Sequence, residues 1–245
     1  MFGFSLDTGK YPEIITLIDE VKNIEGPHPI TYKKVRLINV ENIPGFISAI
    51  ENSSRKYENN GYIHILDQQR TIVSGTFISN LKVVKSKNNN VTVSGNVLNQ
   101  PQGYQKAWDM KLNNKITEKN IWKTFGKDEL QGWLVYALHT CKPGSERKNI
   151  KVEIDGNNFH NLDGFFCTLG EDINGIAGYF GRNLPALYDC LGGDFGVKSI
   201  SELIWTNHKR SKKILKKKFT DIIKIFEHFD TKVSLKLPNK KTGLL

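Results

Sequence analysis

The sequence is poor in the residues that build metal sites and disulfide frameworks. Its three cysteines, Cys141, Cys167 and Cys190, are widely spaced and include no Cys-x-x-Cys pair, which argues against a zinc site or a disulfide scaffold. The six histidines show no His-x-x-x-His or carboxylate–histidine spacing of a ligand set. We therefore expect buried or half-buried thiols, no metal and no cofactor.

Long apolar runs are also absent. No stretch of about 18 apolar residues is present that could cross a membrane, and Met1-Phe2-Gly3-Phe4 has neither the basic start nor the apolar core of a secretory signal. We expect a cytoplasmic protein. The apolar content of 38% and the aromatic content of 10% are nonetheless normal for a chain that buries a core, and 245 residues fit two ordinary domains.

Catalytic motifs are missing as well. The chain has no nucleophile elbow, phosphate-binding loop, zinc motif or plausible pairing of a histidine with a carboxylate. We therefore do not expect an enzyme.

Acidic residues are outnumbered by basic ones, 25 against 35, which gives a net charge of +10. Such an excess usually suggests nucleic acid or anionic surfaces as partners. It is uneven, however, because residues 151–202 contain three basic and eight acidic side chains, while Lys209–Lys218 is largely a run of cations. Ile214 and Leu215 give that run a core side, so we favour a solvated helix face over a phosphate-binding patch.

The first part of the chain is predicted to be α+β with an antiparallel sheet of four or five strands. Pro12–Val21 fits an amphipathic helix with Ile14, Ile18 and Val21 along one stripe, and strand remains open because isoleucine is β-branched. Alternation predicts strands at residues 31–40, 62–66, 71–78, 81–84, 91–98 and 104–112. Helical spacing predicts helices at residues 43–53, 117–125 and 128–138, the last with Asp128 as its N-cap.

Composition changes at Cys141–Asn149, where proline, glycine, serine and charged residues cluster as in a linker. We therefore expect an α+β accessory domain of unrecognised family at residues 1–142 and a second domain at residues 149–240. The aromatic residues of the first domain could form a recognition surface, but core positions are the commoner place for such residues. They are Tyr104, Trp108, Trp122 and Trp133.

The second domain is predicted to be α/β. Strands are expected at residues 151–154, 201–205 and 232–237, and helices around residues 162–169, 184–191, 212–217 and 221–229. Because parallel strands need crossover connections, this interleaving predicts a three-stranded parallel sheet covered by helices.

Gly178–Phe195 is the most informative stretch. Leu184, Leu187 and Leu191 repeat at helical spacing and Gly192-Gly193 marks the helix end, so the opposite face carries Tyr188 and Asp189 outward. The residues that follow one another in a specific order here are Tyr179, Phe180, Gly181, Asn183, Leu184, Ala186, Leu187, Tyr188, Asp189, Cys190, Leu191 and Gly193.

That order resembles the signature of the barstar family of intracellular ribonuclease inhibitors: a tyrosine-rich turn, a Gly-x-Asn-Leu step and a helix ending in Asp-Cys-Leu before a glycine. The resemblance extends from the strand at residue 151 to the one at residue 237. It implies the same small parallel sheet and an immunity protein of a bacterial toxin system, which binds a cognate ribonuclease in the cytoplasm and plugs its active site. The first domain would be an accessory or second contact surface.

The resemblance also implies which residues bind the toxin. A carboxylate takes the place of a substrate phosphate and bonds to arginine and lysine, and barstar is a reference case for carboxylate hot spots and charge-steered association. By position, Asp189 would be the carboxylate and Tyr179 and Phe180 the apolar anchors. The further toxin-binding residues would be Gly181, Asn183, Tyr188, Gly193 and Asp194.

Three positions depart from the family pattern. Pro185 replaces a second acidic residue, Glu227 and His228 are nearest to the usual late-helix glutamate, and Arg182 adds a positive charge to the loop. The candidates to replace the missing charges are Glu171, Asp172, Asp194 and Glu227.

The alternative is a basic nucleic-acid-binding protein that uses the Lys209–Lys218 run and the aromatic sheet residues. We favour the inhibitor, and expect a monomer when free, with no membrane partner and no direct contact to nucleic acid.

Overall fold

The computed structural model describes residues 1–53, 59–142 and 144–237. The chain divides into two compact units, Met1–Asn113 and Asn114–Leu245. The first unit thus ends earlier than residue 142, because the segment that follows Asn113 makes its contacts with helix α4 (Leu162–Asn174) of the second unit. Each unit is described by itself.

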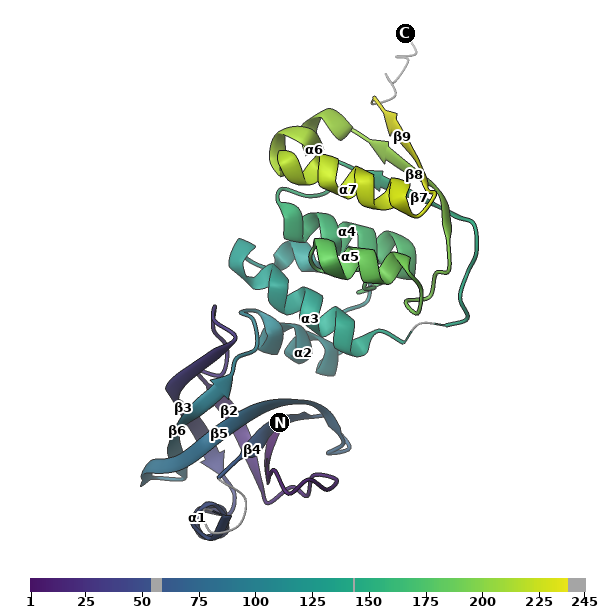
Figure 1. The fold of residues 1–245 in the computed structure, drawn as a ribbon. Coiled ribbons are helices and arrows are strands. Elements are labelled where there is room, and N and C mark those ends of the chain that lie inside the picture. The colour runs from purple at the N-terminus through teal and green to yellow at the C-terminus, as the bar shows by residue number, and fades with distance from the viewer. Residues whose placement is uncertain (54–58, 143, 238–245) are drawn as a thin grey trace. The chain divides into compact units, whose positions relative to one another are not determined.

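The first unit is a closed antiparallel barrel with strand order β1-β2-β3-β6-β5-β4 (Figure 1). Phe2 of β1 lies opposite Ile18 of β2 and Ile65 of β4, so β1 joins the two ends of the sheet and leaves no open edge. The strands are β1 (Phe2–Leu6), β2 (Thr16–Lys22), β3 (Ile30–Val40), β4 (Gly61–Leu66), β5 (Ile72–Lys87) and β6 (Asn90–Leu98).

The barrel core is built from alternate strand residues and from one helix. Val35 of β3 and Val93 of β6 are buried and lie opposite each other, as the period of two along a strand requires. Helix α1 (Ile43–Ser53) covers one end of the barrel (Figure 1). Its Phe46 is fully buried and meets Phe4 of β1 edge to face at 4.8 Å.

The predicted antiparallel sheet is confirmed, but several local predictions in this unit are wrong. Residues 104–112 form helix α2 (Tyr104–Leu112) rather than a strand, because Tyr104, Ala107 and Trp108 are buried at helical spacing. The two short strands expected at residues 71–84 are the single strand β5, which has register shifts against β6. Strand β1 was not predicted, and β2 takes the strand alternative for residues 12–21.

The second unit contains the predicted three-stranded parallel sheet, with strand order β7-β8-β9. Its strands are β7 (Ile150–Asp155), β8 (Ile200–Thr206) and β9 (Lys232–Lys236), and its helices are α3 (Leu130–Thr140), α4 (Leu162–Asn174), α5 (Leu184–Leu191), α6 (His208–Leu215) and α7 (Lys217–His228). Helix α4 packs on β7 and α3, and α7 packs on β9 and α5.

The segment before α3 is only partly helical. The helix expected at residues 117–125 is reduced to the short 3-10 turn η1 (Ile121–Thr124), and a second turn, η2 (Lys127–Glu129), precedes α3. Glu129 rather than Asp128 is the N-cap residue of α3.

An aromatic cluster forms the core of the second unit. Trp205 of β8 stacks on Phe165 of α4 at 5.3 Å and contacts Phe219 of α7 at 4.8 Å, and its indole N–H donates to Ser211 Oγ at 3.0 Å. The three cysteines are free thiols, with Cys167 and Cys190 buried and Cys141 half-buried as expected.

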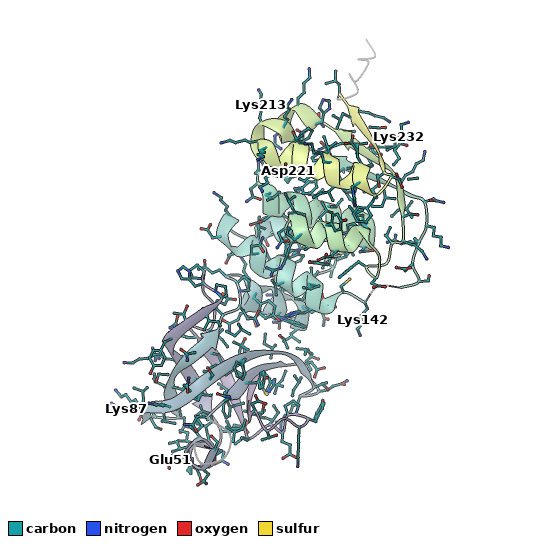
Figure 2. The ribbon with its side chains drawn as sticks, in the orientation of Figure 1. Glu51, Lys87, Lys142, Lys213, Asp221 and Lys232 are labelled. Carbon is teal, nitrogen blue, oxygen red and sulfur yellow. The ribbon has the colours of Figure 1, made fainter. Side chains whose placement is uncertain are left out.

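The basic run at residues 209–218 lies on α6 and the start of α7. Leu215 is buried and Ile214 half-buried, while Lys212 and Lys213 are exposed. Figure 2 shows Lys213 pointing away from the unit. The run therefore has the core side that its sequence predicts.

Replacing Phe46 with alanine tests the role of α1 in the barrel. We expect Phe46→Ala to lower the free energy of unfolding of the first unit by about 3–5 kcal/mol, because it removes a fully buried ring and leaves a cavity. The exposed Ser48→Ala on the same helix should change it by less than about 0.5 kcal/mol. Urea unfolding measures the free energy of unfolding of both variants. A loss for Phe46→Ala as small as that for Ser48→Ala would show that α1 is not part of the barrel core.

Candidate protein-binding site

Helix α5 is fixed at both ends by backbone hydrogen bonds. The Asn183 side chain caps its N-terminus by accepting the Ala186 N–H at 2.8 Å, and Pro185 occupies the first turn, where no N–H is needed. At the other end, the Gly192 N–H donates to the Tyr188 and Asp189 carbonyls. The predicted helix is therefore present with the predicted start and end.

One face of α5 is buried and the other is free. Leu187, Cys190 and Leu191 are buried, whereas the residues at the outward spacing are exposed. The side chain of Asp189 forms no hydrogen bond or ion pair with any residue in the described part of the chain. A carboxylate at this place is available to a partner. The exposed face consists of Pro185, Tyr188, Asp189 and Gly192.

Tyr188 belongs to an exposed aromatic cluster between α5 and the end of α7. Its hydroxyl is hydrogen-bonded to His228 Nε2 at 2.8 Å, and its ring lies 4.8 Å from that of Phe229. Tyr188 is 45% exposed, so the cluster presents an apolar surface with a polar edge next to Asp189. The sequence signal for this cluster was His228 and Phe229 at the end of α7, of which only His228 was noted, as one of the residues nearest to a missing glutamate.

Tyr179 and Phe180 do not lie at the surface, in contrast to the role of exposed anchors expected for them. They are 3% and 0% exposed, and the Tyr179 ring packs near Phe195 at 5.7 Å. Burial raises the pKa of Tyr179 to about 12. The physical reason is that a loop without secondary structure needs large buried side chains to fix its path. In this structure the two rings hold the loop, and Tyr188 is the exposed aromatic residue.

Gly181 is also buried and acts through its backbone. Its φ is +92°, and a Cβ added there would lie 2.9 Å from the Leu187 backbone nitrogen. Only glycine permits both this dihedral angle and this close approach of the loop to α5. Gly181 therefore positions the helix rather than contacting a partner directly.

The loops before and after α5 are joined to each other. Asn174 Nδ2 donates to the Tyr179 carbonyl at 2.8 Å and to the Phe195 carbonyl at 3.1 Å. Arg147 in turn donates to Asn174 Oδ1 at 2.7 Å and to the Gly196 carbonyl at 3.0 Å. These bonds join the loop before α5 to the loop after it and so hold the helix at both ends.

Gly193 and Asp194 lie in the second of these loops. Both have positive φ, +124° and +69°, and the Asp194 N–H donates to Glu146 Oε1 at 2.8 Å. Asp194 is exposed, so its side chain is a second carboxylate close in sequence to the α5 face. Its backbone is held in place by the bond to Glu146.

Glu171 is buried at the C-terminal half of α4 and is 2% exposed. Its Oε2 accepts the Asn120 N–H at 2.7 Å and the Trp122 indole N–H at 3.1 Å, and its Oε1 accepts the Ala177 N–H at 3.2 Å. Burial raises the pKa of this carboxyl group, while its hydrogen bonds oppose the rise. Glu171 therefore links the segment before α3, α4 and the site loop, and does not replace a missing surface charge.

The other proposed substitutes differ in availability. Asp172 is engaged by Lys119 at 3.3 Å, whereas Asp194 and Glu227 are exposed and form no ion pair within the described ranges. Arg182 turns toward α3, where its Nη1 donates to Gln131 Oε1 at 3.4 Å and its carbonyl accepts from Gln131 Nε2 at 3.3 Å. Its positive charge is thus partly engaged on the side of α3.

The described residues contain neither a metal-binding cluster nor a membrane-spanning helix. Across residues 1–53, 59–142 and 144–237, no group of three or more histidine, cysteine or acidic residues could hold a metal ion. No helix in those same ranges is both long and apolar enough to span a membrane. The exposed carboxylate of Asp189 and the exposed ring of Tyr188 give this α/β unit groups that can form charge-assisted and apolar contacts.

Comparison with known families agrees with this class. A family model described as Barstar (barnase inhibitor) matches residues 150–240. This part of the chain is therefore a barstar-family domain, as the resemblance indicated, and the family is one of inhibitors rather than enzymes. No curated protein matches the chain.

The three hydrogen bonds to Glu171 predict a large effect of its removal. We expect Glu171→Ala to lower the free energy of unfolding of the second unit by about 3 kcal/mol, because it leaves two backbone N–H groups and one indole N–H without their acceptor. Its neighbour Asp172→Ala, which breaks only an exposed ion pair, should cost less than about 1 kcal/mol. Urea unfolding followed by tryptophan fluorescence distinguishes them, and equal losses would contradict the structural role of Glu171.

Proposed function

We propose that the chain is an intracellular ribonuclease inhibitor that acts as the immunity protein of a bacterial toxin system, in the cytoplasm of the cell that makes the toxin. The observation that supports this most strongly is the exposed and unpaired Asp189 on the outward face of α5, within a barstar-family domain. A carboxylate in this position can enter a basic nuclease groove in place of a substrate phosphate. It then forms charge-assisted hydrogen bonds with arginine and lysine.

The charge of this region supports the same proposal. Residues 151–202 contain eight acidic and three basic side chains within a chain of net charge +10. Among these acidic side chains, Asp189 and Asp194 are exposed at the site, and exposed carboxylates of this kind attract a basic groove and raise the association rate. Tyr188 would provide the apolar contact beside the charged one, since aromatic side chains next to a desolvated charge are typical of interface hot spots.

The departures from the family pattern define the kind of partner. The exposed Pro185 brings no charge to the first turn of α5, and His228 rather than a glutamate contacts Tyr188. We propose that Asp189 and Asp194 provide the phosphate-mimicking charges, with Glu227 as a third contact. A ribonuclease that binds this surface would therefore place fewer arginine or lysine side chains against the helix than one whose inhibitor has an acidic residue at the position of Pro185.

The proposed toxin-binding set is thus Tyr188, Asp189, Asn183, Gly193 and Asp194 at the surface, with Tyr179, Phe180 and Gly181 behind it. We propose the first unit as an accessory unit, and a monomer as the free form. The barstar-family domain would be the part at residues 149–240.

Replacing Asp189 tests the proposal. The assay is cleavage of a fluorogenic RNA by the proposed cognate ribonuclease, inhibited by the full chain. We expect Asp189→Ala to weaken inhibition about 100-fold, which corresponds to about 2.7 kcal/mol, because it removes the charge that pairs with the catalytic cations.

The matched control is Glu153→Ala. Glu153 is an exposed carboxylate on β7 whose neighbours Val152 and Ile154 face the core, so it lies on the side of the sheet away from the helices. Glu153→Ala removes the same charge as Asp189→Ala and should leave inhibition unchanged. Unchanged inhibition by Asp189→Ala, with circular dichroism showing an intact fold, would rule out this site.

A further inference from the structure

The outer side of three neighbouring barrel strands carries positive charge without negative charge. Strands β3, β6 and β5 lie next to one another in the sheet, and no aspartate or glutamate occurs between Glu25 and Glu41 or between Asp67 and Asp109. We call the outward cations of these strands the basic barrel face. They are Lys34, Arg36, Lys82, Lys85 and Lys87, and all are exposed.

The strand register brings these cations together. Arg36 of β3 lies opposite Thr92 of β6, which in turn lies opposite Lys85 of β5. The next row repeats the arrangement with Lys34, Ser94 and Lys82. Neighbouring strands are about 4.8 Å apart, so each row places two cations about 10 Å apart across a polar central residue.

A hollow lies at the hairpin end of this face. Its volume is about 330 Å³, at the lower end of the range of small-ligand pockets, which suits a phosphate and its neighbouring sugar. Its lining has three cationic and three neutral polar residues and no acidic one. The lining residues are Arg36, Lys85, Lys87, Asn88, Asn90 and Thr92.

The hairpin between β5 and β6 fixes the position of this hollow. Asn88 and Asn89 both have positive φ, 49° and 58°, as a two-residue type I′ turn requires. The turn places Lys87 opposite Asn90 at the end of the hairpin, and Figure 2 shows Lys87 at this end of the barrel. The cations are thus carried on paired strands rather than on a long loop.

The charges of this face are not neutralised within the described residues. None of its five cations forms an ion pair there. On the neighbouring strand β2, Glu20 pairs with Lys22 at 3.4 Å, and Asp19 accepts a hydrogen bond from Asn39 Nδ2 at 3.0 Å. Mutually repelling cations left together on a rigid surface indicate an anionic partner.

An exposed aromatic ring lies on the same face. Tyr32 of β3 is 62% exposed, and its hydroxyl donates to Ser94 Oγ on β6 at 3.2 Å. In the strand register Ser94 lies opposite Lys34, and Tyr32 lies opposite Asn96. The hydrogen bond from Tyr32 to Ser94 is therefore diagonal, and it holds the tyrosine ring along the surface of the sheet. Aromatic rings held on a basic sheet surface are the platforms on which single-stranded bases stack.

We propose that the basic barrel face binds single-stranded nucleic acid, with phosphates on Arg36, Lys85 and Lys87 and a base on Tyr32. The Thr92 hydroxyl and the Asn90 amide of β6, which line the hollow beside the cations, are suited to bases and sugar hydroxyls. A lipid surface is the competing ligand, because Ile30 and Leu98 are exposed at the opposite end of the face. The polar central strand favours nucleic acid, and this binding does not depend on the ribonuclease-inhibitor proposal.

The test measures fluorescence anisotropy of labelled single-stranded oligonucleotides of about 12 nucleotides with the full chain. One arm uses oligouridine and the other oligodeoxyuridine, which has the same base, so that a preference for either shows whether the ribose hydroxyl contributes. Binding should weaken as salt rises from about 50 to 200 mM, and the triple variant Arg36→Ala, Lys85→Ala, Lys87→Ala should lower the logarithmic salt slope by about 2. Its affinity at the lower salt concentration should fall at least about 10-fold.

A matched triple variant controls for net charge. Lys212→Ala, Lys213→Ala and Lys217→Ala remove the same charge from the basic run of α6 and α7 and should leave binding within about 2-fold. Tyr32→Ala should weaken binding about 5-fold or more without changing the salt slope.

Three results would overturn the proposal: no binding of either oligonucleotide at the lower salt concentration, equal losses in the two triple variants, or sedimentation with phosphatidylserine vesicles in the absence of oligonucleotide binding. Circular dichroism confirms that each variant is folded. Asp189→Ala serves as a further control, because it should leave oligonucleotide binding unchanged whether or not it affects ribonuclease inhibition.

Discussion

The buried carboxylate of Glu171 is the constraint on which the second unit depends. It gathers N–H groups from Asn120, Trp122 and Ala177, which belong to the segment before α3 and to the loop before α5. A buried carboxylate without such donors would be costly, so the three segments are stable only together. This explains why residues that precede the barstar-family match at 150–240 belong to the same compact unit, Asn114–Leu245.

The site follows from the same constraint. With its loops joined by Asn174 and Arg147, helix α5 is held in one orientation, and its outward face is determined before any partner arrives. Preorganisation of this kind reduces the entropy that binding must overcome. Asp189 and Tyr188 then meet a partner without rearrangement of the backbone. The barrel of the first unit has a surface of the opposite charge, which fits a separate anionic ligand.

The sequence predicted the elements whose signals are local. The stripe of Leu184, Leu187 and Leu191, with glycines after it, was enough for α5 and its outward carboxylate. The sequence did not reveal closure of the barrel, because β1 pairs with β4 about sixty residues away along the chain. Residues 104–112 were predicted as a strand, because a short apolar pattern can fit both the two-residue period of a strand and the 3.6-residue period of a helix. The burial of Tyr179 and Phe180 was also missed, since a motif shows which residue types occur but not which way a loop turns them.

Hydrogen–deuterium exchange of the full chain, free and in complex with the ribonuclease that we propose as its target, tests the central claim most directly. The account predicts slower exchange in the complex at residues 181–194, which contain α5 and its flanking loops, and no comparable change along β7. Protection confined to the barrel or to the sheet, with residues 181–194 unaffected, would contradict the assignment of α5 as the inhibitory surface.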